Sequence, residues 1–588
     1  MSINDLVLKV NDVLTGSVLI IALVGIGLLF TFKLGFIQIR GFKDGWNRTF
    51  GGLFSKKGDA GKDGMSSFQA LATAIAAQVG TGNIAGAATA IAVGGPGAIF
   101  WMWISAFLGM STIFAEAVMA QKFKQVSDDG TVTGGPVYYI RGAFKGAFGK
   151  VLAAIFAVLI IFALGFMGNA VQSNSIAASW NTAFGIPKIA MGIFVAVVSL
   201  FVFTGGMKRI AKVTELIVPI MAAFYIVGSL IVIFANVTAI PGAFHDIIVG
   251  AFKPAAVAGG AMGATLKLAV QKGVARGLFS NEAGMGSTPH AHAVAKVDHP
   301  VEQGFVAMIG VFIDTFVILN LTALVIITTG SRTSGLTGAQ LSQFAFSTLY
   351  GKFGEIFIAI CMLFFAFSTI IGWYFFGEAN IRYLFGAKAV KIYSIIVCIC
   401  VALGSLQEVD LVWNMADCFN SLMVVPNILA LFALSKVISQ VHEDYFKNFK
   451  KKNYVLIDSD ELKNVGSLSK ISMDGSLEKK SGKIVFNVES VTVDKKLSKE
   501  KGKKELEKKL GLNEEKKTVV KEEKKQEEPS DTVKEGSTVT VDDILSDPEK
   551  YAGKRLKIHC MLPQSVIEAS DGRLIGTINN MTLDKYIE

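Results

Sequence analysis

The segment at residues 78–86, with the sequence QVGTGNIAG, interrupts a long apolar stretch in which an unbroken membrane-spanning helix would be expected. It contains three glycines and three uncharged polar residues. Glycine costs about 1 kcal/mol relative to alanine in a helix interior, so the cluster predicts a helix that opens and exposes its backbone groups. Within hydrocarbon, an opened backbone is tolerated only where it is buried in protein or faces a ligand or an aqueous cavity. We therefore expect residues 80–83 to form half of a binding site for a small zwitterion and a cation.

The composition of the chain is that of a polytopic, all-α membrane protein. Of its 588 residues, 52% are hydrophobic and 18% are charged, and the mean hydropathy is +0.50. Apolar blocks dominate up to about residue 441, and the remainder is rich in Lys and Glu. The net charge of +10 therefore belongs to loops and tail rather than to one basic surface. We expect the lipid bilayer, and no nucleic acid, as a partner.

About eleven stretches approach the length of roughly 20 apolar residues that a membrane span needs. They lie at residues 14–32, 66–94, 96–121, 151–178, 188–205, 212–236, 260–293, 302–329, 353–385, 390–405 and 411–438. Lys and Arg concentrate in alternate loops, for example at Lys208, Arg209 and Lys212, which the positive-inside rule places in the cytoplasm. We expect a multi-pass protein of the cell (inner) membrane, with the N-terminus outside and the C-terminal tail in the cytoplasm.

A second interrupted span, at residues 260–293, contains the sequence SNEAGMGS at residues 280–287. Each broken span is followed by four further spans, and because five is odd the two five-helix units must have opposite orientations. Paired broken helices in such an inverted repeat frame a site near the bilayer midplane. The expected organisation is a peripheral first helix and loop at 1–65, repeats at 66–236 and 237–440, a charged and largely disordered linker at 441–536, and a small β module at 537–588.

The two sides of the first break suit different ligands. The second half of the helix begins near Gly82 and Asn83, whose N–H groups and positive dipole end suit a carboxylate, together with the Thr81 hydroxyl. The carbonyls near Ala77 and Gly80 point the other way and suit a hard cation. Ser368 and Thr369 in the ninth span would add hydroxyl ligands, although such hydroxyls also bond carbonyls of the preceding turn.

Several long motifs resemble those of the alanine or glycine:cation symporter family, the sodium:alanine symporters, over residues from about 15 to 440. They are GTGNIAG at 80–86, GGPGA at 94–98, GGP at 134–136 with Tyr138 and Tyr139, RGLFSNEAGMGS at 276–287, and Trp413-Asn414 with Ala416-Asp417. The resemblance implies the five-plus-five inverted-repeat fold of amino-acid and neurotransmitter sodium symporters with one extra N-terminal helix. It also implies alternating-access uptake of alanine or glycine, with Na⁺ or H⁺ as the coupling ion and no cofactor.

The resemblance also implies a set of substrate-binding residues. These are Gln78, Thr81, Gly82 and Asn83 in the first break, Ser280 and Asn281 in the second, Trp373 as an aromatic wall, and Phe166, Asn169 and Gln172 on one face of the fourth span. Interhelical hydrogen bonding is the alternative for the two amides of that span, and core packing is the alternative for Phe166. A pocket walled by bulky rings favours small side chains, with modest discrimination between neighbours in size.

Charged residues inside the membrane are costly and need a role. We expect Arg276 or Lys272 to pair with one of the acids Glu116, Glu282, Asp314 and Asp417, as a gate or as a brace, and we expect His290 and His292 to lie at a solvated helix end. No nucleophile with its base and no metal cluster is identifiable, so an enzyme is not expected. A channel and a transporter-like sensor remain as alternatives, the second because the tail could regulate or bind a cytoplasmic partner.

Overall fold

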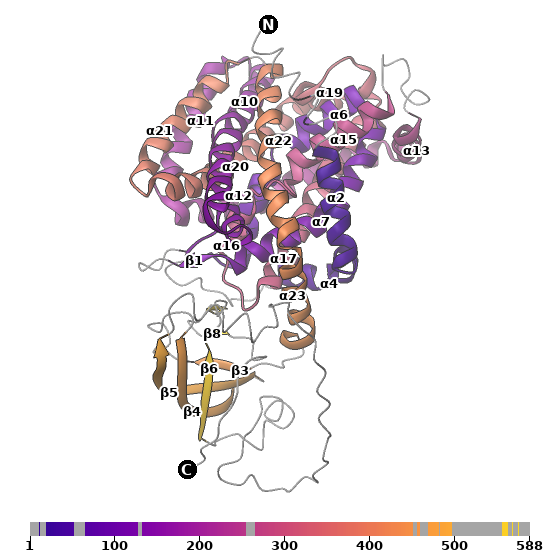
Figure 1. Ribbon diagram of the computed structural model, residues 1–588. Coiled ribbons are helices and arrows are strands. Elements are labelled where there is room, and N and C mark those ends of the chain that lie inside the picture. Colours follow the sequence, from indigo (N-terminus) through magenta and orange to yellow (C-terminus); the bar gives the residue numbers. More distant parts are fainter. Residues whose placement is uncertain are drawn as a thin grey trace. The chain divides into compact units, whose positions relative to one another are not determined.

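The computed structural model describes residues 11, 14, 19–51, 65–126, 132–253, 265–407 and 409–450, followed by strand segments at 455–458, 469–480, 483–496, 555–561, 567–568 and 574–575. Two compact units are distinguished. The first comprises Met1–Lys296 and Pro300–Val441, and the second comprises Val297–His299 and His442–Glu588. The first unit is a bundle of helices and the second contains a sheet (Figure 1).

Within the described residues, six helices are long and apolar enough to cross a membrane. They are α7 (Gly97–Lys122), the continuous helix Gly146–Phe184, α12 (Gly206–Ala235), the continuous helix Pro300–Thr328, α20 (Lys352–Phe385) and the segment Trp413–Ala433 of α22 (Val409–Ala433). Shorter apolar helices include α2 (Leu19–Lys33), α11 (Lys188–Phe203) and α21 (Ala389–Gly404). Each of these helices coincides with an expected span.

Two further helices lie between the expected spans. They are α13 (Ile240–Phe252) and α19 (Gly338–Tyr350), and with 13 residues each they are too short to cross a bilayer. Other short elements of the helical unit are α3 (Ile37–Arg40), α4 (Phe42–Phe50), α8 (Pro136–Ala143), the turns η4 (Val237–Ala239) and η6 (Ser331–Thr333), and the strands β1 (Gln125–Val126) and β2 (Val132–Thr133). Helix α23 (Ser435–Asp444) begins in the helical unit and ends in the second unit, which also contains the turn η7 (Tyr445–Phe449).

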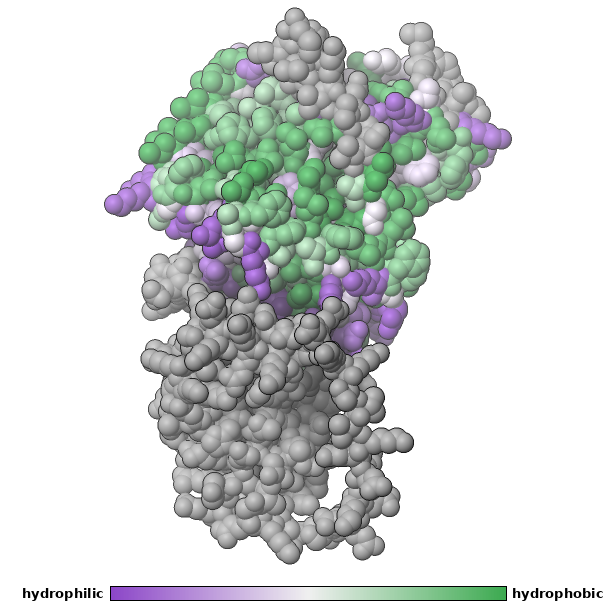
Figure 2. All heavy atoms as spheres, viewed as in Figure 1, coloured by the Kyte–Doolittle hydropathy of each residue, from purple (hydrophilic) through white to green (hydrophobic). Residues whose placement is uncertain are grey.

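The outer surface of the helical unit is apolar. Figure 2 shows hydrophobic residues spread over much of the face in view. Large apolar side chains are exposed on several helices, among them Phe201 on α11, Phe234 on α12 and Ile392 on α21. Because soluble proteins rarely expose apolar patches of this extent, the surface is suited to contact with hydrocarbon.

The first break lies where the glycines predict it. Helix α5 (Ser67–Gln78) begins with a capping box between Ser66 and Gln69 and ends just before the glycines. The helix resumes as a π turn, η2 (Gly82–Gly86), which continues into α6 (Ala87–Gly94). The backbone between α5 and η2 therefore lies inside the protein, where Val79, Gly80 and Thr81 are all buried.

The second break follows α15 (Leu266–Asn281) and precedes the short helix α16 (Pro289–Ala293). The connection turns through three residues with positive φ, which are Glu282 at 57°, Gly284 at 91° and Gly286 at 80°. Glycine adopts such angles at little cost, which explains two of the three positions. The third position carries a glutamate.

The two breaks pack against each other. A Cβ atom built on Gly82 would lie 3.0 Å from Cα of Ser280, so the backbones are almost in contact. On the other side of α5, a Cβ on Gly372 of α20 would lie 2.9 Å from Cβ of Ala77. Small residues at both contacts allow the helices to approach closely, as is common in membrane bundles.

Two spans contain a π-helical stretch. The stretch η3 (Ile161–Gly168) joins α9 (Gly146–Ile160) to α10 (Asn169–Phe184), and η5 (Phe312–Leu319) joins α17 (Pro300–Val311) to α18 (Asn320–Thr328). Stretches of π-helix are rare and occur frequently at functional sites. The stretch η5 carries residues that meet both breaks, and η3 packs against α20.

The second unit contains a six-stranded sheet of order β6-β4-β5-β3-β8-β7. The strands are β3 (Val455–Asp458), β4 (Ser469–Lys480), β5 (Lys483–Lys496), β6 (Arg555–Met561), β7 (Ile567–Glu568) and β8 (Leu574–Ile575). β4 pairs antiparallel with both β5 and β6, and β3 runs parallel to β5.

Three strands, β3 to β5, lie within the linker at 441–536 that we expected to be largely disordered, and the sequence did not predict them. The reason is visible in β5, where Ile484, Phe486 and Val488 alternate with other residues at the period of a strand but lie between lysine-rich segments that dominate the composition. The run STVTV at 537–541, expected as part of the β module, lies outside the described residues.

Candidate functional site

Asn83 and Asp314 tie the first break to the π stretch η5. The Asn83 side chain accepts a hydrogen bond from the Gly80 N–H at 3.0 Å and donates to Asp314 at 2.7 Å to Oδ1 and 3.0 Å to the carbonyl. Ser280, at the end of α15, donates to the same Asp314 Oδ1 at 2.9 Å. One buried carboxyl group thus receives a hydrogen bond from each break.

A second set of hydrogen bonds joins the breaks directly. Gln78 donates through Nε2 to the carbonyl of Asn281 at 2.7 Å. Asn281 in turn donates through Nδ2 to Thr315 at 3.3 Å and accepts at Oδ1 from the Ala283 N–H at 3.1 Å. The expected residues Gln78, Asn83, Ser280 and Asn281 therefore belong to one buried network, and Asp314 lies at its centre.

Two backbone N–H groups at the first break are occupied in this structure, and that of Asn83 is one of the two expected to bind a carboxylate. The Asn83 N–H donates to the Gly80 carbonyl at 3.3 Å, and the Thr81 N–H donates to Oε1 of Gln172 at 3.1 Å. Gln172 lies on α10, so this second bond brings the fourth span against the break. An arriving carboxylate would have to compete with both acceptors.

Four of the expected substrate-binding residues carry a buried polar atom that has no hydrogen-bond partner within the described part of the chain. These atoms are Gln78 Oε1, Thr81 Oγ1, Asn169 Oδ1 and Gln172 Nε2. Leaving a buried polar atom unpaired costs about 1–3 kcal/mol. A polar ligand that satisfied any of these atoms would recover that energy.

Trp373 of α20 is fully buried. A Cβ on Gly168, the residue before Asn169, would lie 2.5 Å from Cζ3 of the indole. Phe279 meets the ring edge-on, with centroids 5.6 Å apart. Phe166, by contrast, packs against Phe162 and Tyr393, which is the packing role that the sequence left open.

The hydroxyls of Ser368 and Thr369 face the carbonyl side of the first break. Thr369 Oγ1 lies 2.9 Å from the Ala76 carbonyl, and Ser368 Oγ lies 3.4 Å from the same oxygen. A Cβ on Gly80 would come within 2.3 Å of Thr369 Oγ1. The carbonyl that meets the hydroxyls is thus that of Ala76, one residue before the expected Ala77, whose own Cβ packs against Gly372.

Glu116 and Glu282 hold the second break. Glu116 of α7 accepts from the N–H groups of Gly284 at 3.0 Å and Gly286 at 2.9 Å, and from Asn427 of α22 at 2.6 Å. Glu282 accepts from Trp373 Nε1 and from Ser287 Oγ, both at 2.5 Å. The sequence marks both acids as needing a role, and their contacts with the connection supply one.

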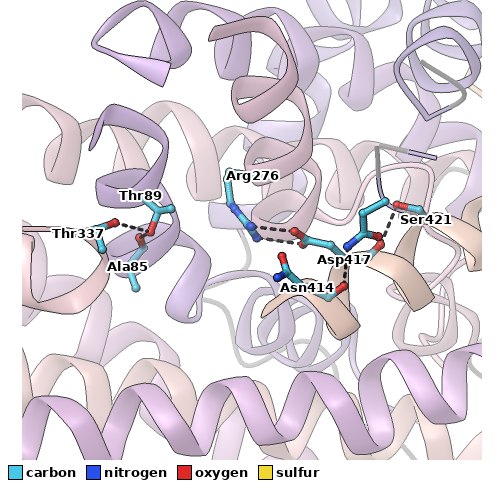
Figure 3. Close-up of polar contacts among 8 residues, drawn as sticks. Ala85, Thr89, Arg276, Thr337, Asn414, Asp417 and Ser421 are labelled. Carbon is cyan, nitrogen blue, oxygen red and sulfur yellow. Dashed lines mark hydrogen bonds and ion pairs between the residues drawn. The ribbon is translucent and has the colours of Figure 1, made fainter. Parts of the chain in front are cut away.

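Arg276 pairs with Asp417 of α22, which identifies the acid that the sequence could not name. The two side chains form a bidentate contact, with Nη1–Oδ1 at 3.0 Å and Nη2–Oδ2 at 2.7 Å (Figure 3). The guanidinium also lies over the ring of Trp413 at 4.5 Å from the centroid. This planar, two-point geometry is specific to arginine.

The expectation of a solvated helix end for His290 and His292 is wrong, because both are buried. His290 contacts the Ser287 carbonyl at 2.7 Å and Asn380 at 2.8 Å, and His292 contacts Gln303 at 2.8 Å. Partners on other helices replace the water that we expected around them.

Comparisons with known proteins agree on one family. A model of the sodium:alanine symporter family matches residues 1–458. The chain is 41% identical over 444 residues to the sodium/alanine symporter AgcS of Methanococcus maripaludis, covering 74% of this chain and 96% of that protein. It is 42% identical over 456 residues to the probable sodium/glutamine symporter GlnT of Bacillus subtilis, covering 77% and 93%.

Solved structures give a distant likeness. The transporter MhsT in complex with L-phenylalanine is matched with a TM-score of 0.46 at 14% identity, over 66% of this chain and 90% of that chain. A manganese transporter of Eremococcus coleocola is matched with a TM-score of 0.41 at 15% identity, over 63% and 78%.

Proposed function

Because the chain belongs to the sodium:alanine symporter family, we propose that it carries alanine or glycine across the cell membrane by alternating access between its two broken helices. The family couples Na⁺ to the transport of small amino acids and is not an enzyme family. The finer assignment to alanine or glycine is ours.

The observation that carries this proposal is the group of unpaired buried atoms at Gln78, Thr81, Asn169 and Gln172. We assign the amino group of the substrate to the acceptors among them and its carboxylate to the Thr81 hydroxyl and the backbone at Gly82. Ser280 and Asn281 line the same region from the second break. Names of relatives include both alanine and glutamine, so the side-chain preference is a matter for measurement.

For Na⁺ we propose the oxygen group formed by Ser368, Thr369 and the carbonyl of Ala76, with Gly80 beside it. Hard cations take oxygen ligands, and carbonyls freed at a broken helix serve this purpose in secondary transporters. Both hydroxyls contact the Ala76 carbonyl, which supports grouping these oxygens, and both also contact the Phe365 carbonyl of the preceding turn, the alternative that the sequence left open.

For the fold we propose a five-plus-five inverted repeat. The first broken span is followed by α7, α9–α10, α11 and α12, and the second is followed by α17–α18, α20, α21 and α22. Helix α2 precedes the first repeat and is the extra one. This order, with an odd number of spans in each repeat, supports opposite orientations of the two halves.

We further propose that the N-terminus lies outside the cell and that the C-terminal unit lies in the cytoplasm. The support comes from the alternate distribution of Lys and Arg between loops.

The ion pair between Arg276 and Asp417 closes one side of the site between α15 and α22, and opening it would admit the substrate.

The decisive experiment uses purified protein in proteoliposomes with an inward Na⁺ gradient. We expect saturable uptake of labelled alanine that stops when K⁺ replaces Na⁺, and counterflow of labelled alanine against unlabelled alanine or glycine. Flux that does not saturate would indicate a channel. Absence of transport with retained alanine binding would indicate a sensor, and a variant ending at residue 445 would show whether the C-terminal unit is needed for uptake.

A further inference from the structure

Glu282 occupies a backbone conformation that glutamate rarely adopts. Among described residues, Glu282 and Phe36 are the non-glycine residues with positive φ. This region costs an L-residue roughly 1–2 kcal/mol, and the nearby Gly284 and Gly286 avoid that cost. A glutamate is therefore retained at 282 against a local preference for glycine, which indicates that its side chain is needed.

The side chain of Glu282 has two partners from different parts of the fold. Oε1 accepts from Nε1 of Trp373, on α20, and Oε2 accepts from the hydroxyl of Ser287, just before α16. Both distances are 2.5 Å, and Glu282 and Trp373 are buried. The carboxyl group therefore links the second break to the indole.

The indole of Trp373 is held at three points. Glu282 accepts its N–H, Gly168 lies against its six-membered ring, and Phe279 meets it edge-on. Gly168 directly precedes Asn169, whose Oδ1 is one of the unpaired atoms assigned to the substrate. The ring therefore packs against the continuous helix that carries that amide, and the proposed function places it in the wall of the substrate site. Of the three contacts, the hydrogen bond is the polar and directional one.

We propose that Glu282 is a positioning residue that fixes the Trp373 ring and thereby limits the side-chain size of the transported amino acid. This inference rests on the proposed function, because it assigns Trp373 to the wall of the substrate site. The role is carried by hydrogen-bond acceptance and not by charge, since both partners of the carboxyl group are neutral donors.

The test measures inhibition of labelled alanine uptake by alanine, 2-aminobutyrate and norvaline, which differ by successive methylene groups. The principal variant is Glu282→Gly, which removes the side chain at a position where glycine has no backbone strain. We expect the ratio of the 2-aminobutyrate to the alanine inhibition constant to fall about ten-fold, the discrimination typical of one methylene, and the norvaline ratio to fall at least as far. Glu282→Gln should keep most of the wild-type ratio, because its amide oxygen accepts the same N–H.

Trp373→Phe provides the second variant, because it removes the donor from the other side of the bond. Adding Glu282→Gly to Trp373→Phe should change the ratio no further, since the two single changes act on one contact. Glu378→Gln is the matched control: Glu378 is another buried acid, on α20, but it pairs with Arg382. Its ratio should equal that of the wild type.

Three outcomes would overturn the inference. The first is a Glu282→Gly variant that transports slowly with an unchanged ratio, which would make Glu282 a brace of the second break only. The second is a Glu282→Gln variant that behaves like Glu282→Gly, which would indicate a role of charge. If Glu282→Gly does not fold, an unchanged ratio in Trp373→Phe has the same effect. Failure of the wild type to take up alanine with Na⁺ would instead refute the proposed function.

Discussion

Thr369→Val tests the cation assignment with little change in shape. Valine replaces the hydroxyl by a methyl group of similar size, so no cavity is left next to Ala76 or Gly80. The hydroxyl now contacts the carbonyls of Ala76 at 2.9 Å and Phe365 at 3.0 Å, which leaves a lone pair for an ion. A contact between a polar group and a charge contributes about 1.5–3 kcal/mol. Since about 1.4 kcal/mol is a factor of ten, the Na⁺ concentration for half-maximal uptake should rise roughly 10- to 150-fold.

The assay is initial uptake of labelled alanine in proteoliposomes over a series of external Na⁺ concentrations, with K⁺ holding ionic strength constant. Thr328→Val is the matched control. Thr328 is also a buried threonine, and its hydroxyl contacts the carbonyl four residues earlier at 2.7 Å. It lies on α18, away from the breaks. Thr369→Val with the Na⁺ dependence of the wild type would refute the assignment. Adding Ser368→Ala should raise the Na⁺ requirement further.

Three further variants probe the breaks and the ion pair. Asn83→Ala removes the hydrogen bonds to Gly80 and Asp314, each of which contributes about 1 kcal/mol. It should lower the thermal unfolding midpoint, and it should lower the affinity for alanine as measured by scintillation proximity. An unchanged unfolding midpoint would contradict the hydrogen-bond network between the breaks. Gly82→Ala places a Cβ 3.0 Å from Cα of Ser280 and should lower the free energy of unfolding by about 1–3 kcal/mol through overpacking. Alanine uptake per folded molecule should also fall. Normal uptake would show that the two breaks separate freely. Arg276→Lys loses the bidentate contact with Asp417 and should slow alanine counterflow while equilibrium binding is retained; equal loss of both would favour a brace over a gate.

The positions of both breaks could be predicted from the sequence because the cause is local. Glycine weakens a helix wherever it occurs, and α5 ends at Gln78, directly before the glycines. Helix α15 continues through Gly273 and Gly277 and ends at Asn281, shortly before Gly284 and Gly286, so a cluster of glycines with polar residues marks the break where a single glycine does not. The six helices that are long and apolar enough to cross a membrane could likewise be found from apolar length alone, whereas the short helices α13 and α19 lie outside the expected spans.

The partners across the site could not be predicted, because they are distant in sequence. Asp314 is 231 residues from Asn83, and Asp417 is 141 residues from Arg276. Helical periodicity gives the face of a residue but not the helix that this face meets. The choice of the Ala76 carbonyl over that of Ala77 depends on the rotation of the last turn of α5 against α20, which is equally a tertiary property.

The geometry at Gly80 has a thermodynamic consequence for coupling. A Cβ at this residue would meet Thr369 Oγ1 at 2.3 Å and Gln172 Oε1 at 3.2 Å, so one peptide unit separates the proposed Na⁺ ligands from the proposed substrate ligands. An ion that fixes this backbone prepares the adjacent N–H groups for a carboxylate. Because linkage is reciprocal, alanine must tighten Na⁺ binding by the same factor as Na⁺ tightens alanine binding. Equilibrium titrations of each ligand with and without the other measure both factors, and independent binding of the two would show that the first break does not couple them.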